Sequence, residues 1–499
     1  MEFTISNRAK KITMGMVVVG LIATIVGFLG QKEHLHPEVI DDHTVMVSYH
    51  HEVSEADVEG LKASLTEQAA HHNLTVQISD ASHGDDHHAS TGIHWAVVAN
   101  ETEGAAHGHH GATHTPAEAI SHLFHSGDVA LADHHFKRFW SNLMVNGFFF
   151  FSIALGALFF FALTYATETA WSIILKRIFE SVMMTMAYGG VILLVIFIAG
   201  SLGLHHIYHW MDPEVMDPNS HHYDALIAGK EAFLNKPFFW VRTVAYFAVF
   251  FLFMRGFRKR SLLEDTTIDP ENKLHFKQYT KAAAFLVLFG YLSSVMSWDW
   301  IMSIDTHWFS TLFGWYTFSG IWISGMLTVL FTTLYLKKKG HLENVNESHI
   351  HDLGKWVFAI SFLWSYLWFS QFMLIWYSNI PEEVTYYITR IEEYNGLFFG
   401  VFLVNFILPM VFMMSRESKR AYGVLMTIGS IIFVGHWLDV FLMVMPGTVF
   451  GHWEMGLLEI GMFVMFLGGF IMLLLKNLTT APLEPQNSPY LDESKHHEI

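Results

Sequence analysis

Long apolar runs set the organisation of this chain. A run of roughly 20 apolar residues can cross the hydrocarbon core of a bilayer as a helix. Such runs lie at residues 12–30, 140–163, 180–203, 236–255, 278–298, 309–336, 354–378, 395–415, 422–445 and 454–476. The pattern predicts an all-α polytopic membrane protein with ten transmembrane helices.

Clusters of basic residues predict the orientation of these helices. Lys and Arg gather at positions 8–11, 176–177, 255–260, 337–339 and 416–420. Short loops rich in Lys and Arg stay on the cytoplasmic side, and these clusters share one side only if all ten runs span. We therefore expect both termini to be cytoplasmic. The first run resembles a signal peptide, but no small-residue cleavage site precedes Gln31 and Lys32, so we expect an uncleaved anchor over 1–30.

Residues 31–135 form one large hydrophilic insert, expected on the outer side of the membrane. Apolar residues alternate around 45–49, 74–78 and 93–97, and recur at helical spacing over 58–69, which predicts a small β-α-β-β module. The flanking stretches are rich in Gly, Asp and His and are expected to be partly disordered. The insert holds 19 histidines. Their spacing is compositional rather than tetrahedral, so we predict a solvated, pH-sensitive face and no specific metal site.

Composition supports a membrane protein and excludes several kinds of redox centre. Hydrophobic residues make up 52% of the chain and charged residues 15%, against about 25% charged in soluble domains. The formal charge of −17 comes mostly from the insert. There is no cysteine, which excludes disulfides, cysteine-ligated iron–sulfur clusters, zinc–thiolate sites and covalent haem c. Only His436 lies well inside a predicted span, which argues against a b-type haem between two helices.

Polar residues inside predicted spans are the candidates for chemistry, because burying them in lipid is costly. His436 and Asp439 are three residues apart and share a helix face. With Glu459 they could form a proton relay, or a buried network that only locks the helices together. Gln371 and Asn405 add polar groups to neighbouring spans. Pro409 cannot donate to the carbonyl of Asn405, which predicts a kink that holds a water or serves packing.

Two further charged residues lie near helix ends. Glu180 opens the third predicted span behind two basic residues, and we expect an interfacial ion pair there that could also feed a proton path. Arg242 lies near the outer end of the fourth span, where it could snorkel or pair with an acid.

The segment SWDWIMSIDTHWFST (297–311), which we call the hinge, joins the fifth and sixth spans. Trp298, Trp300 and Trp308 fit an aromatic belt at the membrane interface. We then expect its polar residues to face headgroups, water or a partner protein; these are Asp299, Asp305 and His307.

Three motifs carry a resemblance to a known family. WDWIMSIDTHWFSTLFGWY (298–316), FLWSYLWFSQFMLIWYSNIPEE (362–383) and GHWLDVFLMVMP (435–446) resemble the F subunit of alternative complex III, a member of the polysulfide reductase NrfD-like membrane proteins. The resemblance covers about 140–476. It implies two four-helix bundles, helices two to five and six to nine, flanked by one helix at each end. The expected regions are 1–30, 31–135, 136–305, 306–450 and 451–499, the last being a helix and a cytoplasmic tail.

The resemblance also implies a role. Alternative complex III lies in the bacterial inner membrane, oxidises quinol and reduces a periplasmic cytochrome c or an attached terminal oxidase. Haem c and iron–sulfur clusters lie in partner subunits, among them a multihaem cytochrome, an iron–sulfur protein and a NrfD-like C subunit. The F subunit holds no redox centre. Its matched positions are Gln371, Asn405, His436 and Asp439 in the spans, with Asp299, Asp305 and His307 as a docking surface in the hinge.

Two alternatives remain open at this stage. The chain could hold a quinol pocket of its own, lined by aromatic residues, with His436 and Asp439 accepting protons. It could also be a stand-alone proton-coupled transporter, since such proteins often contain repeats and interrupted helices. In every case lipids are expected around the spans, and nucleic acid is not an expected partner.

Overall fold

A computed structural model describes residues 3–30, 36–49, 55–71, 74–80, 93–101, 115–126, 133–220, 223–451 and 453–498. Within these ranges, ten helices are long and apolar enough to cross a membrane. The chain is therefore a multi-pass membrane protein. It divides into two compact units, an insert unit of Phe28–Phe136 and a helical body of Met1–Gly27 with Lys137–Ile499.

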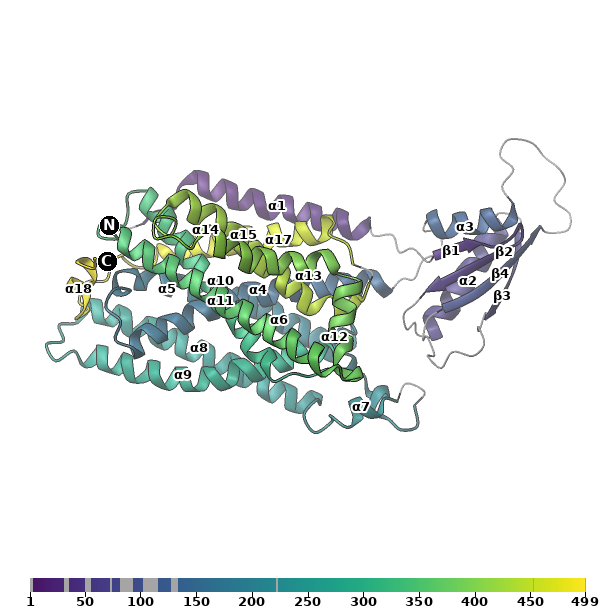
Figure 1. The fold of residues 1–499 in the computed structure, drawn as a ribbon, viewed down its shortest axis with the longest axis horizontal. Coiled ribbons are helices and arrows are strands. Elements are labelled where there is room, and N and C mark those ends of the chain that lie inside the picture. The colour runs from purple at the N-terminus through teal and green to yellow at the C-terminus, as the bar shows by residue number, and fades with distance from the viewer. Residues whose placement is uncertain are drawn as a thin grey trace. The chain divides into compact units, whose positions relative to one another are not determined.

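The spans are built from the long helices of Figure 1. They are α1 (Asn7–Leu29), α4 (Asp133–Ala166), α5 (Lys176–Met183) with α6 (Met186–Ser201), α8 (Lys236–Thr266), α9 (Lys273–Trp300), α10 (Leu312–Lys338), α11 (Glu347–Ser378), α13 (Asn395–Phe402) with the π-helix η5 (Leu403–Ile407) and α14 (Leu408–Phe412), α15 (Tyr422–Val444) and α17 (Leu457–Leu478). Short elements connect them: η1 (Ile173–Leu175), η2 (His209–Met211), η3 (Pro213–Met216), α7 (Ala225–Ala228), η4 (Met302–Ile304), α12 (Pro381–Glu392), α16 (Pro446–Val449) and α18 (Leu491–Lys495).

The third span differs from its prediction. The apolar run predicts a start at residue 180, but the membrane-length helix covers Ile173–Ser201 and is interrupted at Met184 and Thr185, between α5 and α6. Lys176 and Arg177 lie inside it and are buried, and Glu180 is in the middle of α5 rather than at its opening. Hydropathy did not predict the start of this span, residues 173–179, because its two cations are polar in sequence but are paired in the structure with acids of another helix, Glu264 and Asp265.

The two ends of the described chain lie at the same end of the helical body (Figure 1). The ring of Phe3 lies 5.3 Å from that of His341, and His497 Nε2 is 2.7 Å from Asp352 Oδ2. We call this the terminal end, and we call residues 479–498 the tail. The segment 297–311, the hinge, covers the last turn of α9 and the connection to α10, at the opposite end of the helical body, which we call the hinge end.

The centre of the helical body is α4. In its apolar window 94% of residues are buried, against 17% in α1, which shows that α4 is enclosed by protein. Small residues allow this contact: a Cβ at Gly156 would lie 2.1 Å from the carbonyl oxygen of Ile321, and one at Gly325 2.6 Å from Ala157 N. The backbones of α4 and α10 therefore touch, as in close helix pairs of membrane proteins.

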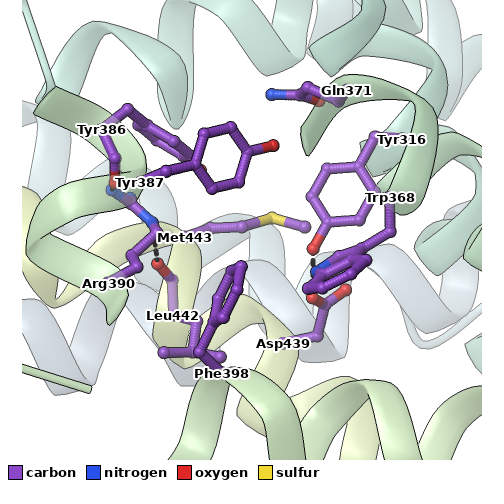
Figure 2. A pocket seen from close by; sticks show the side chains of 10 residues that line it. All are labelled: Tyr316, Trp368, Gln371, Tyr386, Tyr387, Arg390, Phe398, Asp439, Leu442 and Met443. Atoms are coloured by element: carbon purple, nitrogen blue, oxygen red, sulfur yellow. Dashed lines mark hydrogen bonds between the residues drawn. The ribbon is translucent and has the colours of Figure 1, made fainter. Parts of the chain in front are cut away.

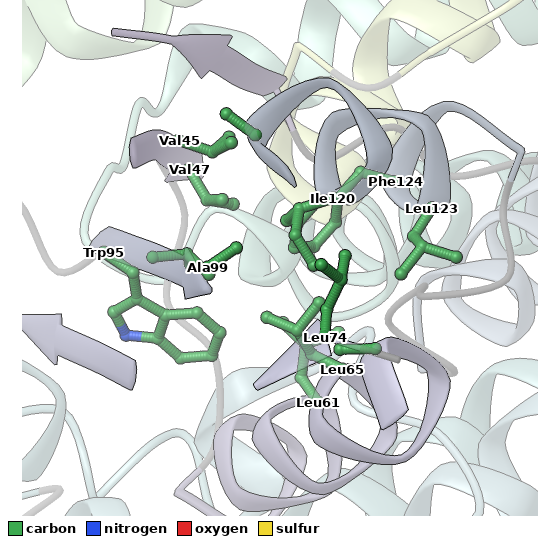
Figure 3. Packing of buried hydrophobic residues seen from close by; sticks show 13 residues of the cluster. Val45, Val47, Leu61, Leu65, Leu74, Trp95, Ala99, Ile120, Leu123 and Phe124 are labelled. Carbon is green, nitrogen blue, oxygen red and sulfur yellow. The ribbon is translucent and has the colours of Figure 1, made fainter. Parts of the chain in front are cut away.

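The insert unit contains one antiparallel sheet in the order β1-β2-β4-β3. The strands are β1 (His36–Val39), β2 (Thr44–Tyr49), β3 (Leu74–Asp80) and β4 (Ile93–Glu101), and the helices are α2 (Glu55–His71) and α3 (Pro116–Ser126). Val45 pairs with Val97 and Val47 with Trp95, so one sheet face is apolar. Figure 3 shows Val45, Val47 and Trp95 on the side of the sheet that faces both helices, which contribute Leu65 and Ile120 among others.

Sequence alternation predicted three of these strands and α2. It missed β1, which has only four residues including Pro37, and α3, which lies among polar residues. The histidine-rich stretches at 81–92 and 102–114 lie outside the described residues.

We predict that Gly156→Leu destabilises the helical body by about 3 kcal/mol or more, because α10 has to move away from α4. Thermal unfolding of the purified protein in detergent measures this. Gly290→Leu on α9 is the matched control, since a Cβ there meets nothing within 4 Å. Equal destabilisation by both variants would contradict a close contact of α4 with α10.

Candidate proton-transfer site around Asp439

Asp439 lies on α15 inside the helical body, with 1% of its surface exposed. Its Oδ1 accepts a hydrogen bond from the hydroxyl of Tyr316 on α10, and its Oδ2 accepts one from Nε1 of Trp364 on α11, at 2.9 Å. Figure 2 shows the Tyr316 hydroxyl directed at the carboxyl group. Both donors are neutral side chains, so they hold the carboxyl group in place without fixing its charge.

His436 lies one helical turn from Asp439 and is equally buried. Its Nδ1 is 3.9 Å from Asp439 Oδ2, and neither ring nitrogen has a hydrogen-bond partner among the described residues. The edge of the ring meets Trp364, with centroids 5.4 Å apart. The structure thus brings His436 and Asp439 together, as their spacing predicts, but leaves a gap that one water could bridge.

Two small cavities meet at Asp439. The first is lined by Gln371, Tyr386 and Arg390, and its volume open to the centres of water molecules is about 20 Å³ (Figure 2). The second is lined by His436 and Ser324, with a corresponding volume of about 10 Å³. About 10–15 Å³ by this measure holds one water. Each cavity therefore has room for about one water.

Unpaired polar atoms line these cavities. Gln371 Oε1 faces the first, and Ser152 Oγ, Thr317 Oγ1 and both nitrogens of His436 face the second; none has a hydrogen-bond partner in the described chain. Buried polar groups are nearly always hydrogen-bonded to protein or to ordered water. Bound water on both sides of Asp439 would satisfy them.

A row of hydroxyl groups continues from the second cavity along α10. Ser324, Thr328 and Thr332 are four residues apart, buried, and each donates to the carbonyl four residues before it, at 2.8, 2.9 and 2.7 Å. Residues four apart lie on one helix face. The row runs toward the terminal end, and each hydroxyl oxygen can still accept a hydrogen bond.

The first cavity is closed toward the hinge end by a buried arginine. Arg390 of α12 donates to Asp305 Oδ2 at 3.0 Å and to the carbonyls of Tyr386 and Leu442 at 2.8 and 3.1 Å. The guanidinium lies 3.3 Å from the centre of the Tyr386 ring. Asp305 is partly exposed. Nothing near Arg390 in the sequence indicates its role, because its carboxylate partner Asp305 belongs to a distant segment of the chain.

Asn405 lies in the π-helix η5 and is fully buried. Pro409 has no N–H, and the π-helix accommodates this gap in the hydrogen-bond ladder where a kink was predicted. Neither amide atom of Asn405 has a partner in the described residues. A Cβ at Gly435 would lie 2.1 Å from Asn405 Oδ1, so the amide faces the backbone next to His436.

Glu459 belongs to a different contact. It accepts from Arg138 at 2.7 and 2.9 Å, from Asn142 at 2.9 Å and from the backbone N–H of Gly456 at 3.0 Å. The structure therefore places it in a saturated ion pair at the start of α17, and does not bring it to Asp439.

Asp299 also corrects an expectation, because its side chain does not face water or a partner. It is fully buried and accepts from Arg242 Nε and Nη2 at 2.8 and 2.7 Å and from Tyr246 at 2.5 Å. The Arg242 guanidinium lies 4.0 Å from each ring centre of Phe233 and Phe238. The hinge thus supplies the acid that Arg242 pairs with.

Two of the three tryptophans of the hinge are likewise inside the body, whereas Trp298 is half-buried. Trp300 is fully buried and donates to Thr243 at 3.1 Å, and Trp308 stacks on Tyr386 with ring centroids 3.8 Å apart. His307 alone among the predicted docking residues is well exposed, at 55% of its side chain. It lies 2.5 Å from Asp224.

No protein-family model matches the chain, and no curated protein matches it either.

We predict that Arg242→Met destabilises the protein by about 3–5 kcal/mol, because Asp299 then stays buried without its cation. The double variant Arg242→Met, Asp299→Asn is expected to recover most of this loss, because it leaves neither charge buried without its partner. Unfolding in detergent at pH 7 measures both. Equal stability of the single and double variants would show that the lost ring contacts of Arg242 dominate instead.

Acid is predicted to loosen the loop around α7. Burial raises the pKa of Asp224, but hydrogen bonds from His307 and two backbone N–H groups lower it by a larger amount. The pKa of Asp224 therefore lies below its usual range. The stabilisation is therefore present above about pH 4 and lost as the pH falls through the lowered value. Amide exchange of Leu226 and Ile227, corrected for intrinsic rates, should follow this loss in the wild type and not in Asp224→Asn.

Proposed function

We propose that this chain is a membrane subunit of a quinol-oxidising complex of the alternative complex III type. It would hold no redox centre, and would contribute to assembly and to a proton-conducting path through Asp439. The observation that carries the proposal is the site itself, a buried carboxyl group held by neutral donors between two water-sized cavities. The three motifs of the sequence support the family, including its two four-helix bundles, in a bacterial inner membrane.

The path would connect the two ends of the helical body. From the terminal end, taken as cytoplasmic, protons would pass the hydroxyl row of α10 and the second cavity to reach His436 and Asp439. From there they would cross the first cavity to the Arg390–Asp305 pair at the hinge end, taken as periplasmic. Carboxyl, imidazole and water groups are the usual members of such chains. Gln371 and Asn405 would hold waters beside the path, whereas Glu180, Arg242 and Glu459 would be structural.

The partners would lie at the hinge end. The multihaem cytochrome, the iron–sulfur protein, the C subunit and an attached oxidase carry or receive electrons in this kind of complex. His307 and Asp224 form the exposed part of the proposed docking surface. Asp299 is not part of this docking surface, because its side chain is buried within this chain.

The quinol-pocket alternative is less favoured by the volume of the site. The larger cavity offers about 20 Å³ to water centres, whereas a cavity that binds benzene is on the order of 150 Å³. A quinone ring would need the surrounding aromatic residues to move. The transporter alternative has no specific observation in its favour.

The test uses the intact complex in sealed vesicles. Asp439→Asn is expected to leave quinol oxidation within about twofold of wild type and to reduce coupled proton release at least tenfold, because the amide cannot exchange a proton. The double variant Arg242→Met, Asp299→Asn is the matched control, since it removes a buried carboxylate that is sealed by Arg242 without leaving an unpaired charge, and proton release should stay coupled. Unchanged proton release in Asp439→Asn would overturn the path. Failure of the chain to co-purify with a multihaem cytochrome would overturn the class.

A further inference from the structure

A second polar cluster lies at the terminal end, away from Asp439. Three cations and three carboxylates of α5 and α8 are buried there and paired; they are Lys176, Arg177 and Arg258 with Glu180, Glu264 and Asp265. For example, Lys176 Nζ is 2.8 Å from Glu264 Oε2, and Arg177 Nη1 is 2.6 Å from Glu180 Oε2. The opposite charges balance, so this network can be buried without a net charge.

At the edge of this network, three buried side chains have polar atoms without a partner in the described residues. Tyr165 of α4 and His275 of α9 are 2% and 3% exposed, and their ring centroids are 5.5 Å apart. His275 Nδ1 lies 4.0 Å from Glu264 Oε1. The Tyr165 hydroxyl, both His275 nitrogens and this Oε1 atom have no hydrogen-bond partner in the described residues.

The unpartnered atoms include both hydrogen-bond donors and acceptors, and this mixture indicates which kind of ligand the site would bind. The tyrosine hydroxyl and one imidazole nitrogen are donors, whereas the carboxylate oxygen and the other imidazole nitrogen accept. A bound cation would leave the donors unsatisfied, and a bound anion would leave the acceptors unsatisfied. Water satisfies both, and buried waters usually make about three such bonds.

The tail covers this place. The ring of Tyr490 lies 5.2 Å from that of His275. Next to it, the backbone N–H of Gln486 donates to Asp265 Oδ1 at 3.2 Å, and the Asn487 amide donates to the Asp265 carbonyl at 2.9 Å. The site is therefore enclosed by α4, α8, α9 and the tail.

We propose that Tyr165, Glu264 and His275 form a hydrated proton-exchanging site at the terminal end, separate from Asp439. A proton from a bound water adds to an unpartnered nitrogen of His275, where the N–H bond formed replaces the O–H bond broken. The imidazolium is stabilised by Glu264, and the water then recovers a proton from the solvent. Imidazole is the side chain best suited to do this near neutral pH.

The charged groups around His275 come from every neighbouring element. They are Glu264 of α8, Glu168 after α4 and Lys176 of α5, and this lysine is itself paired with Glu264. Tyr165 and Tyr490 are neutral neighbours.

Infrared difference spectra of the purified full chain between pH 8 and pH 5 test the proposal. With ¹⁵N-labelled histidine, the wild type is expected to show a ring signal that is lost in His275→Gln. His205→Gln is the matched control: His205 is as buried, but both of its ring nitrogens are hydrogen-bonded, to Ile196 and Ile207. Removing it should leave the signal unchanged.

Two further variants guard against misfolding as the explanation. Glu264→Gln should keep the signal but move its midpoint at least about one pH unit lower, since an opposite charge about 4 Å away is lost. Tyr165→Phe should keep it with a smaller shift. Superimposable spectra of wild type and His275→Gln would overturn the proposal. Asp439→Asn should not affect the signal, so this inference and the proposed function can fail independently.

Discussion

Pairing of buried charge is the constraint on which this structure depends. An ion in an apolar interior costs several kcal/mol unless an opposite charge and hydrogen bonds compensate it. The helical body meets this cost repeatedly with arginine: Arg242 holds Asp299, Arg138 holds Glu459, and Arg177 holds Glu180. Asp439 is treated differently, because its hydrogen-bond donors are a phenol and an indole. A carboxyl group without a fixed cation can change its charge without breaking an ion pair, and this distinguishes a site of exchange from a structural lock.

The spans were predictable because their signal is local. A bilayer requires about 20 apolar residues in succession, and each run contains its own evidence. Local hydropathy did not predict the start of the third span, which contains Lys176 and Arg177. The cost of burying these two cations is offset by acids about 90 residues away, and no short sequence window contains both partners. Likewise, Arg138 lies just before a predicted span, and nothing near it in the sequence indicates that it binds Glu459.

The candidate site was predictable in part. The i, i+3 spacing of His436 and Asp439 places them on one face, and polar residues within apolar runs drew attention to Gln371 and Asn405. Sequence reasoning could not place Tyr316, Trp364 or Arg390, because aromatic residues are abundant in every span and only tertiary contact selects these. The hinge shows the same limit. Tryptophan beside aspartate suits a membrane interface and a buried polar cluster equally well. In the structure Asp299 forms a buried ion pair with Arg242, and Trp300 is buried with its indole N–H donating to Thr243.

The tail has a consequence for biosynthesis. Its residues bind the start of α11 through Asn346 and His349, the η1 region through Ser494, and the end of α8 through Asp265. These residues leave the ribosome only after all ten spans have been synthesised. The contacts between the tail and α8, α11 and the η1 region can therefore form only in chains whose synthesis has passed the tenth span.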